Sequence, residues 1–268
     1  MFADTGEHPS KFRVYRRASA FTDASQATLI ASNVTAMFYG DRTVTDGTWF
    51  YGLVGLDDAG NASSLSNILS VNYDSTPPSF AISYGKVPPA GVGPLDVTLT
   101  SSEKLLTAPG LTIRPYVTAS PAPVGLTRVD DFTYNGIFDI TASTPSGTAA
   151  VSVSGRDLAG NAFSGAPSGV PLVIDTKGPG GVIATNPIEP VQVTSNVNVS
   201  VSLTLNEPAK VNTIPQLTFT PPVGSQVNVA MIGSGASWTG TLPLNPGMGN
   251  GFGQFALSAE DSLGNVGT

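Results

Sequence analysis

The feature that most constrains the fold of this chain is an internal repeat with a period of about 100 residues. An alternating run followed by Asp-x-x-Gly-Asn occurs three times, and its first aspartates are Asp57, Asp157 and Asp261. The intervals between them are 100 and 104 residues. Self-similarity at a fixed period is the signature of a chain built from repeated structural units.

Two further patterns have the same period. Val-Asn-Tyr-Asp74 precedes a proline pair, and Val-Ile-Asp175 precedes Pro179 one period later. The strand-like run that ends at Glu103 is matched by the one that ends at Glu207. Since independent patterns rarely share a period by chance, we predict one domain per repeat. The predicted modules are residues 1–75 (the first module), 76–176 (the middle module) and 177–268 (the last module).

The alternation inside each repeat is typical of β-strands with one buried face. Val97, Leu99 and Ser101 fall on one side of a strand, and Thr98 and Thr100 fall on the other. Thirty glycines and 22 prolines interrupt the chain too often for helices of ordinary length. Short strands, frequent turns and a repeat of about 100 residues together predict tandem β-sandwiches.

Two kinds of turn are predicted between these strands. Asn-Gly favours a two-residue hairpin, so we expect a turn at Asn135-Gly136. In Asp-x-x-Gly-Asn the aspartate can accept local backbone N–H groups, and the glycine can supply a positive φ.

The middle and last modules resemble bacterial immunoglobulin-like domains, which occur in tandem in large secreted and surface proteins. The resemblance covers roughly residues 76–268. It rests on Ser102-Glu103 and Asn206-Glu207-Pro208, on the Asp-x-Ala-Gly-Asn hairpin, and on the Val-Asp-Thr linker. It implies an all-β chain of tandem immunoglobulin-like and fibronectin III-like β-sandwiches with an extracellular, bacterial-surface location.

The first module instead resembles the later strands of a fibronectin type III domain. The matching segments are 12–16, 39–41, 46–51 and 57–61. Trp49 stands where that family has its corner tyrosine, and we expect it to fill the core without replacing the bond of the tyrosine hydroxyl. The resemblance also implies that the first module lacks its first two strands and that the last module lacks its final strand. A fragment of a longer product explains this more simply than strand donation by a partner, and either case makes the middle module the most robust one.

The composition excludes several classes of function. The chain has no cysteine and a single histidine, so a thiol nucleophile, a cysteine zinc site and a polyhistidine metal site are excluded. With a net charge of −7 and no basic cluster beyond Arg13, Arg16 and Arg17, we expect no nucleic-acid partner. No apolar run is long enough to span a membrane, so no membrane insertion is expected in this segment.

Carboxylates are the only abundant reactive groups, and two interpretations of them remain open. Calcium takes six to eight oxygen ligands from loops, so Asp57, Asp74, Asp157 and Asp175 are candidate ligands of a calcium ion between modules. The alternative is that these aspartates only cap turns and fix linkers, with no cofactor bound.

The two remaining glutamate candidates and the two tryptophans are expected to have structural roles. Glu103 and Glu207 occupy equivalent positions of different modules, so they should not meet as a catalytic pair. Trp49 and Trp238 would stack on sugars only if exposed, and Trp238 aligns with Phe132 and Tyr134 of the middle module, which favours packing.

The sequence therefore favours a non-catalytic array of spacer or adhesin type whose partners are the neighbouring modules of the same chain. Two alternatives remain: a module that binds a cell-surface glycan or protein, and an accessory region of a secreted hydrolase whose active site lies outside residues 1–268.

Overall fold

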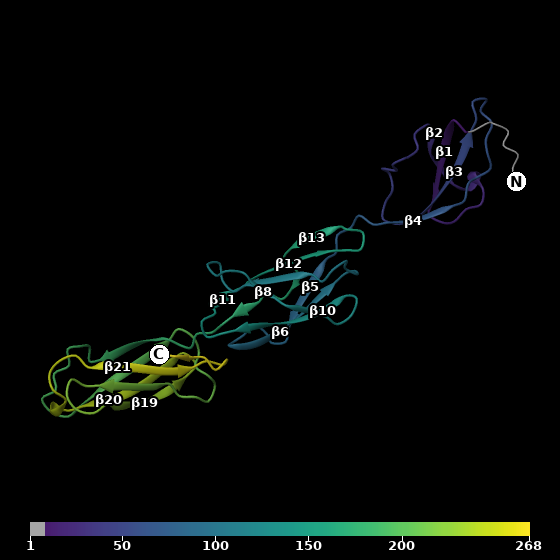
Figure 1. Cartoon of the computed structure of the whole chain (residues 1–268). Helices are drawn as coiled ribbons and strands as arrows, with labels where there is room; N and C mark the ends of the chain where they lie inside the picture. Colours follow the sequence, from purple (N-terminus) through teal and green to yellow (C-terminus); the bar gives the residue numbers. More distant parts are fainter. Residues whose placement is uncertain (1–8) are drawn as a thin grey trace. The chain divides into compact units, whose positions relative to one another are not determined.

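The computed structural model describes residues 9–268 and shows an all-β protein, which confirms the predicted fold class (Figure 1). Its helical residues within this range form two single-turn 3-10 helices, η1 (Ala24–Gln26) and η2 (Pro246–Met248). The strands pair almost entirely antiparallel, and β14 with β5 is a parallel exception. No helix in the described part of the chain is long and apolar enough to cross a lipid bilayer.

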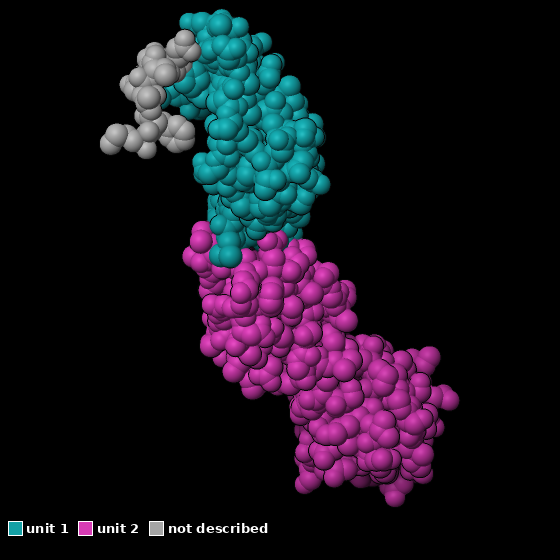
Figure 2. Space-filling view, turned by 90° about the vertical axis from the view of Figure 1, so that its right-hand side faces the viewer, with its two compact units in different colours: residues 1–78, 156–163 teal, residues 79–155, 164–268 magenta. Residues whose placement is uncertain are grey.

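The chain forms two compact units (Figure 2). Among the described residues, the first contains 9–78 together with 156–163, and the second contains 79–155 together with 164–268. All strand pairings recorded for the described residues fall inside one of the predicted modules. The module boundaries near 76 and 177 themselves stay a prediction, and residues 1–8 of the first module lie outside the described residues.

The first module contributes a single antiparallel sheet with the strand order β2-β1-β3-β4. The strands are β1 (Lys11–Arg17), β2 (Thr28–Val34), β3 (Gly47–Leu56) and β4 (Leu69–Tyr73). Val54 and Leu56 are buried on one face of β3, and Phe21 is buried near Gly52 of the same strand. The side chains at alternate positions of β3 belong to the opposite face.

The middle module is a sandwich of a five-stranded and a four-stranded sheet. The five-stranded sheet has the order β14-β5-β6-β10-β9, the four-stranded sheet has the order β13-β12-β7-β8, and β11 pairs with β15 beside them. The strands are β5 (Phe80–Tyr84), β6 (Gly93–Ser101), β7 (Gly110–Arg114), β8 (Ala122–Val124), β9 (Leu126–Arg128), β10 (Thr133–Ile140), β11 (Gly147–Thr148), β12 (Ala150–Arg156), β13 (Ala162–Gly165), β14 (Ser168–Gly169) and β15 (Val173–Ile174).

The last module curls one seven-stranded sheet around its core, in the order β16-β17-β20-β19-β18-β21-β22. The strands are β16 (Gly181–Asn186), β17 (Val197–Leu205), β18 (Gln216–Thr220), β19 (Val227–Ser234), β20 (Ser237–Leu244), β21 (Gln254–Glu260) and β22 (Val266–Gly267). Strand β19 pairs with β18 through its first residues and with β20 through its later ones. It therefore connects the part of the sheet that contains β16, β17 and β20 with the part that contains β18, β21 and β22.

The repeat seen in the sequence reappears in the register of the sheets. Leu99 on β6 lies opposite Tyr134 on β10, and one period later Leu203 on β17 lies opposite Trp238 on β20. Tyr134 and Trp238 are both buried, as the alignment predicted. Val97, Leu99 and Ser101 are buried while Thr98 and Thr100 are not, so the predicted alternation of β6 is confirmed.

The predicted hairpin at Asn135-Gly136 is wrong. Strand β10 runs straight through both residues and pairs with β6 on one side and β9 on the other. The glycine serves a close approach of strands instead, because a Cβ on Gly136 would lie 2.7 Å from the backbone oxygen of Gly125. Gly240, its counterpart one period later, is equally crowded, with Ala230 O at 2.7 Å.

Candidate cation site

The Asp-x-x-Gly-Asn turns have the same hydrogen bonds in all three modules. In the last module one carboxylate oxygen of Asp261 accepts the backbone N–H of Asn265 at 2.9 Å. The other oxygen accepts the Asn265 side-chain amide at 2.8 Å. Gly264, with φ of +87°, provides the left-handed residue that the turn needs. The equivalent bonds of Asp57 with Asn61 and of Asp157 with Asn161 measure 2.7–2.9 Å.

These bonds explain the acidity of two of the aspartates. Hydrogen bonds from Asn61 lower the pKa of Asp57. Burial raises the pKa of Asp157, but hydrogen bonds from Asn161 and its neighbours outweigh burial and leave the pKa below its ordinary value. Each carboxylate is therefore held in its charged form by its own turn.

The asparagine of two of these turns also holds the linker that precedes its module. Asn265 donates its second amide hydrogen to the backbone oxygen of Asp175, at 3.1 Å. In the first unit Asn161 makes the same bond to the backbone oxygen of Asp74, also at 3.1 Å. The linker aspartates found in the sequence are thus placed at the hairpin turns by a direct hydrogen bond.

Asp175 is fixed from the other side as well. Its backbone N–H donates to the oxygen of Ala90 in the middle module, at 3.0 Å. Its carboxylate accepts the hydroxyl of Ser146 at 3.4 Å and the backbone N–H of Lys177 at 3.2 Å. One residue is therefore bonded to both the middle and the last module.

This arrangement brings three carboxylates together in the second unit. Oxygen atoms of Asp175, Glu207 and Asp261 lie within 4.8 Å of one another. Calcium binds oxygens at roughly 2.3–2.6 Å, so two ligands on opposite sides of such an ion are separated by about this distance. Asp261 is buried, whereas Asp175 and Glu207 are partly exposed.

The electrostatics of this cluster are unfavourable without a cation. Burial raises the pKa of Glu207, and the nearby carboxylates of Asp175 and Asp261 raise it further. Three oxygens from three side chains form a hard donor set of the kind that calcium prefers. Further ligands would have to come from water or backbone oxygens.

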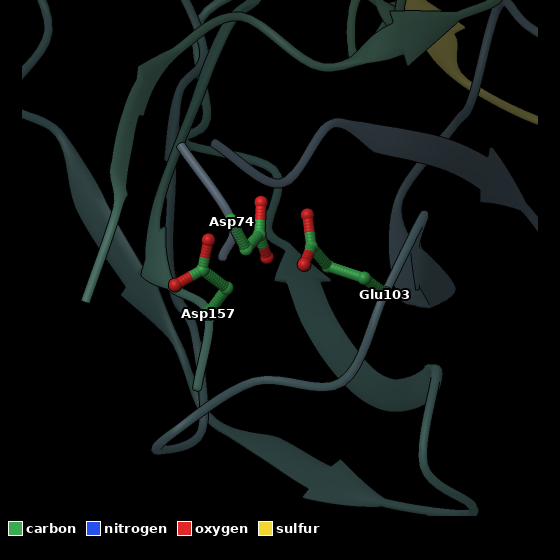
Figure 3. Close-up of side chains that lie close together, drawn as sticks. All are labelled: Asp74, Glu103 and Asp157. Atoms are coloured by element: carbon green, nitrogen blue, oxygen red, sulfur yellow. The ribbon is translucent and has the colours of Figure 1, made fainter. Parts of the chain in front are cut away.

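The four calcium ligands predicted from the sequence therefore lie in different surroundings. Asp74 and Asp157, both in the first unit, lie close to each other (Figure 3). Asp175 joins a cluster whose other members, Glu207 and Asp261, the sequence reasoning did not propose as ligands. Asp57 belongs to no such group among residues 9–268. The repeat aligns Asp175, Glu207 and Asp261 with Asp74, Glu103 and Asp157 one period earlier, but it does not show which of these positions meet in space.

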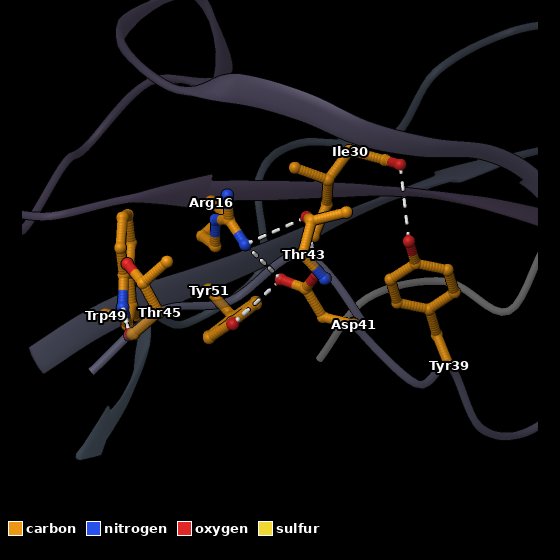
Figure 4. Close-up of polar contacts among 8 residues, drawn as sticks. All are labelled: Arg16, Ile30, Tyr39, Asp41, Thr43, Thr45, Trp49 and Tyr51. Atoms are coloured by element: carbon orange, nitrogen blue, oxygen red, sulfur yellow. Dashed lines mark hydrogen bonds and ion pairs between the residues drawn. The ribbon is translucent and has the colours of Figure 1, made fainter. Parts of the chain in front are cut away.

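The indole N–H of each tryptophan donates a hydrogen bond to a backbone oxygen. Trp238 is 6% exposed and donates its indole N–H to the oxygen of Gly235 at 3.0 Å, so it offers no face for a sugar. Trp49 donates to the oxygen of Thr45 at 2.7 Å (Figure 4). Its indole N–H therefore has a backbone partner four residues upstream, and the expectation about the corner-tyrosine bond stays a prediction. Arg16 stacks on its ring at 4.5 Å.

No protein-family model matches the chain, and no curated protein matches its sequence. Solved structures that resemble it include a tetra-tandem repeat from the extending region of a large adhesion protein, with 18% identity, a TM-score of 0.34, and coverage of 98% of this chain and 66% of that one. A second is from a 1.5-MDa bacterial ice-binding adhesin, with 14% identity, a TM-score of 0.36, and coverage of 97% and 84%.

A third resembling structure contains the domains FN1–FN3 of chicken CNTN1, with 15% identity, a TM-score of 0.26, and coverage of 97% of this chain and 86% of that one. With identities below 25% and TM-scores below 0.5, these likenesses carry no inference about what this chain does.

Proposed function

We propose that this chain is a non-catalytic spacer, an array of β-sandwich modules of adhesin type in a bacterial extracellular or surface protein. Its task is to hold other parts of a larger protein at a distance. The location and the adhesin type are supported by the resemblance of residues 76–268 to tandem bacterial immunoglobulin-like domains. The mechanical role is supported by the junction between the middle and last modules.

The observation that carries the proposal is the double anchoring of Asp175. A spacer transmits position only if its joints resist bending, and a flexible linker would let the modules reorient freely. Here the N–H of Asp175 is bonded to Ala90 and its C=O to Asn265, on the two sides of the joint. A Cβ on Gly91 of the middle module would lie 3.1 Å from the Cβ of Leu263 in the last. The joint is packed as well as hydrogen-bonded.

The experiment uses the absence of cysteine from the chain. Cysteines at the exposed strand positions Thr127 and Ser202 allow two spin labels to be attached, one on the middle and one on the last module. Double electron–electron resonance on the full chain should give one narrow distance distribution. The same pair in an Asn265→Ala background should give a broader one. A broad distribution in the chain without Asn265→Ala would contradict the spacer proposal.

The calcium prediction stays a proposal at the same joint. A cation held by Asp175, Glu207 and Asp261 would tie the linker, a strand end and the hairpin of the last module together. Ligand binding to the folded state stabilises it by RT ln(1 + [L]/Kd), or about 2.7 kcal/mol at one hundred times Kd. Thermal unfolding of the full chain should therefore shift to higher temperature in calcium relative to EDTA, and Glu207→Gln should remove the shift. An unchanged midpoint would retire the metal site and leave the spacer proposal intact.

A further inference from the structure

Two Asn-Gly dipeptides occur in the chain, Asn135-Gly136 and Asn250-Gly251. An asparagine that precedes glycine is prone to deamidation, because glycine has no side chain to shield its backbone nitrogen from the neighbouring side-chain amide. Both asparagines are exposed, so access of water does not distinguish them. Their backbones do, since the first dipeptide lies within strand β10 and the second lies in a loop.

The backbone of Asn135-Gly136 is held in an extended conformation. Gly136 lies opposite Val97 of β6 on one side and Leu126 of β9 on the other. In deamidation the side-chain Cγ of asparagine must reach the nitrogen of the next residue, which requires ψ to turn away from its extended value of about +135°. A residue paired on both sides can reach that geometry only when the sheet opens.

The dipeptide Asn250-Gly251 lies in the loop between β20 and β21, outside any strand pairing. Within residues 9–268 no hydrogen bond is recorded for the side chain of Asn250 or for the N–H of Gly251. Both residues are exposed, and the adjoining Phe252 is 94% exposed. The two groups that must react are therefore accessible, and no recorded hydrogen bond has to break before they meet.

The repeat shows what the same position does in the other modules. Asp46, Ser146 and Asn250 each stand eleven residues before the aspartate of an Asp-x-x-Gly-Asn turn, and each precedes a glycine with φ between +138° and +143°. The carboxylate of Asp46 accepts the backbone N–H of Ser75 at 2.9 Å. The hydroxyl oxygen of Ser146 accepts the backbone N–H of Thr176 at 3.0 Å. The side chain at this position is thus a hydrogen-bond acceptor in both modules.

We propose that Asn250 is a site of spontaneous deamidation, which gives the last module the carboxylate that the first module carries at Asp46. The backbone nitrogen of Gly251 bonds to Cγ of Asn250, the Cγ–Nδ2 bond breaks, and the amide nitrogen leaves as ammonia with the proton of the Gly251 N–H. Water then opens the cyclic imide, at Cγ to give aspartate or at the backbone carbonyl carbon to give isoaspartate. Either product adds one negative charge to a chain whose net charge is −7.

The test follows both asparagines in the same sample of the full chain at mildly alkaline pH. Mass spectrometry of proteolytic peptides measures the replacement of the amide NH₂ by OH at each site over time. In the folded chain Asn250 should convert at least about tenfold faster than Asn135, because strand pairing confines reaction at Asn135 to opening events. In concentrated urea the two rates should become similar, since the sheet no longer restrains either dipeptide. Asn250→Gln is the control, and it should remove the product from the loop peptide alone.

Three results would overturn the proposal. The first is a rate at Asn250 that does not exceed the rate at Asn135 in the folded chain. The second is a difference that persists unchanged in urea, because the fold would then not be its cause. The third is formation of aspartate without isoaspartate, since the cyclic imide gives both and direct hydrolysis of the amide gives aspartate alone. Methylation by an isoaspartate-specific methyltransferase detects the second product.

Discussion

The side-chain amide of Asn265 lies 3.1 Å from the backbone oxygen of Asp175, a residue 90 positions earlier in the chain. The same amide donates to the carboxylate of Asp261 at 2.8 Å, so both of its hydrogens are used. Asn265 is 8% exposed. A single buried side chain thus closes a turn and fixes a linker.

We predict that Asn265→Ala destabilises the last module by about 1–3 kcal/mol, because it removes two N–H donors and leaves a buried acceptor on Asp261 and a part-buried acceptor on Asp175 unsatisfied. In a Trp49→Phe background Trp238 is the only tryptophan, so its fluorescence during urea unfolding reports on the last module. The matched control is Asn61→Ala in a Trp238→Phe background, where the fluorescence of Trp49 reports on the first module. The Asn61 amide is bonded to Asp57 at an exposed turn, and among residues 9–268 no linker bond of this kind is recorded for it. A control loss equal to that of Asn265→Ala would show that the linker bond contributes nothing.

Two glycines of the linker provide a second matched pair of substitutions. A Cβ on Gly178 would lie 2.1 Å from the backbone nitrogen of Gly267, whereas a Cβ on Gly180 would come no nearer than 3.9 Å to Asn206. We expect Gly178→Ala to lower the unfolding free energy of the last module by about 1–3 kcal/mol through overpacking. Gly180→Ala should stay within about 0.5 kcal/mol of the parent chain. The same tryptophan fluorescence measures both, and similar losses at the two positions would refute the close approach of the linker to β22.

The raised pKa of Glu207 predicts how the unfolding free energy depends on pH. Because the folded-state pKa lies above the ordinary value of 4.5, the folded protein binds this proton more tightly than the unfolded chain does. The charged carboxylate therefore costs stability above the folded-state pKa, and this cost disappears as the pH falls through that pKa toward 4.5. We expect Glu207→Gln to raise the unfolding free energy at pH 7 in EDTA and to have a smaller effect at pH 4.

Urea unfolding at the two pH values checks this prediction. Glu260→Gln serves as the control, because it breaks the ion pair with Lys210 at 2.6 Å and should give no gain at pH 7. A loss of stability for Glu207→Gln at pH 7 in EDTA would mean that repulsion from Asp175 and Asp261 does not destabilise the folded protein.

The buried strands could be predicted from the sequence because their signal is local and regular. In β6 the period of two alone separates Val97 and Leu99 from Thr98, and burial follows it. The repeat predicted the equivalence of Tyr134 and Trp238 because both fill the same core position. In both cases one physical requirement, an apolar side chain on the inner face, decides the residue type.

The candidate site was harder to predict because its members come from three separate segments. Glu207 was compared only with Glu103, its counterpart in another module, although its neighbours in space are Asp175 and Asp261. Asp57 was a candidate because it lies near the end of the first module. The described residues of the first module contain no strand equivalent to β6, which ends next to Glu103, so a repeat position alone does not bring a glutamate to Asp57.

Gly136 shows how a local signal can mislead, and it gives the last prediction. Asn-Gly favours a tight turn in isolation, but pairing with β6 and β9 on both sides outweighs that preference. At Gly136 an added Cβ would meet Gly125 O at 2.7 Å and Val124 Cγ1 at 2.9 Å. At Gly125 nothing lies within 4 Å of an added Cβ.

Gly136→Ala should therefore lower the midpoint of the middle module in calorimetry of the full chain, with a loss of about 1–3 kcal/mol. Gly125→Ala should leave the midpoint nearly unchanged, and Gly240→Ala should lower that of the last module by a similar amount, because the same crowding recurs at Ala230 O. If Gly136 served instead as an exposed turn residue, alanine at positions 125 and 136 would have effects of the same size. Equal effects would therefore contradict the assignment of Gly136 to a central strand.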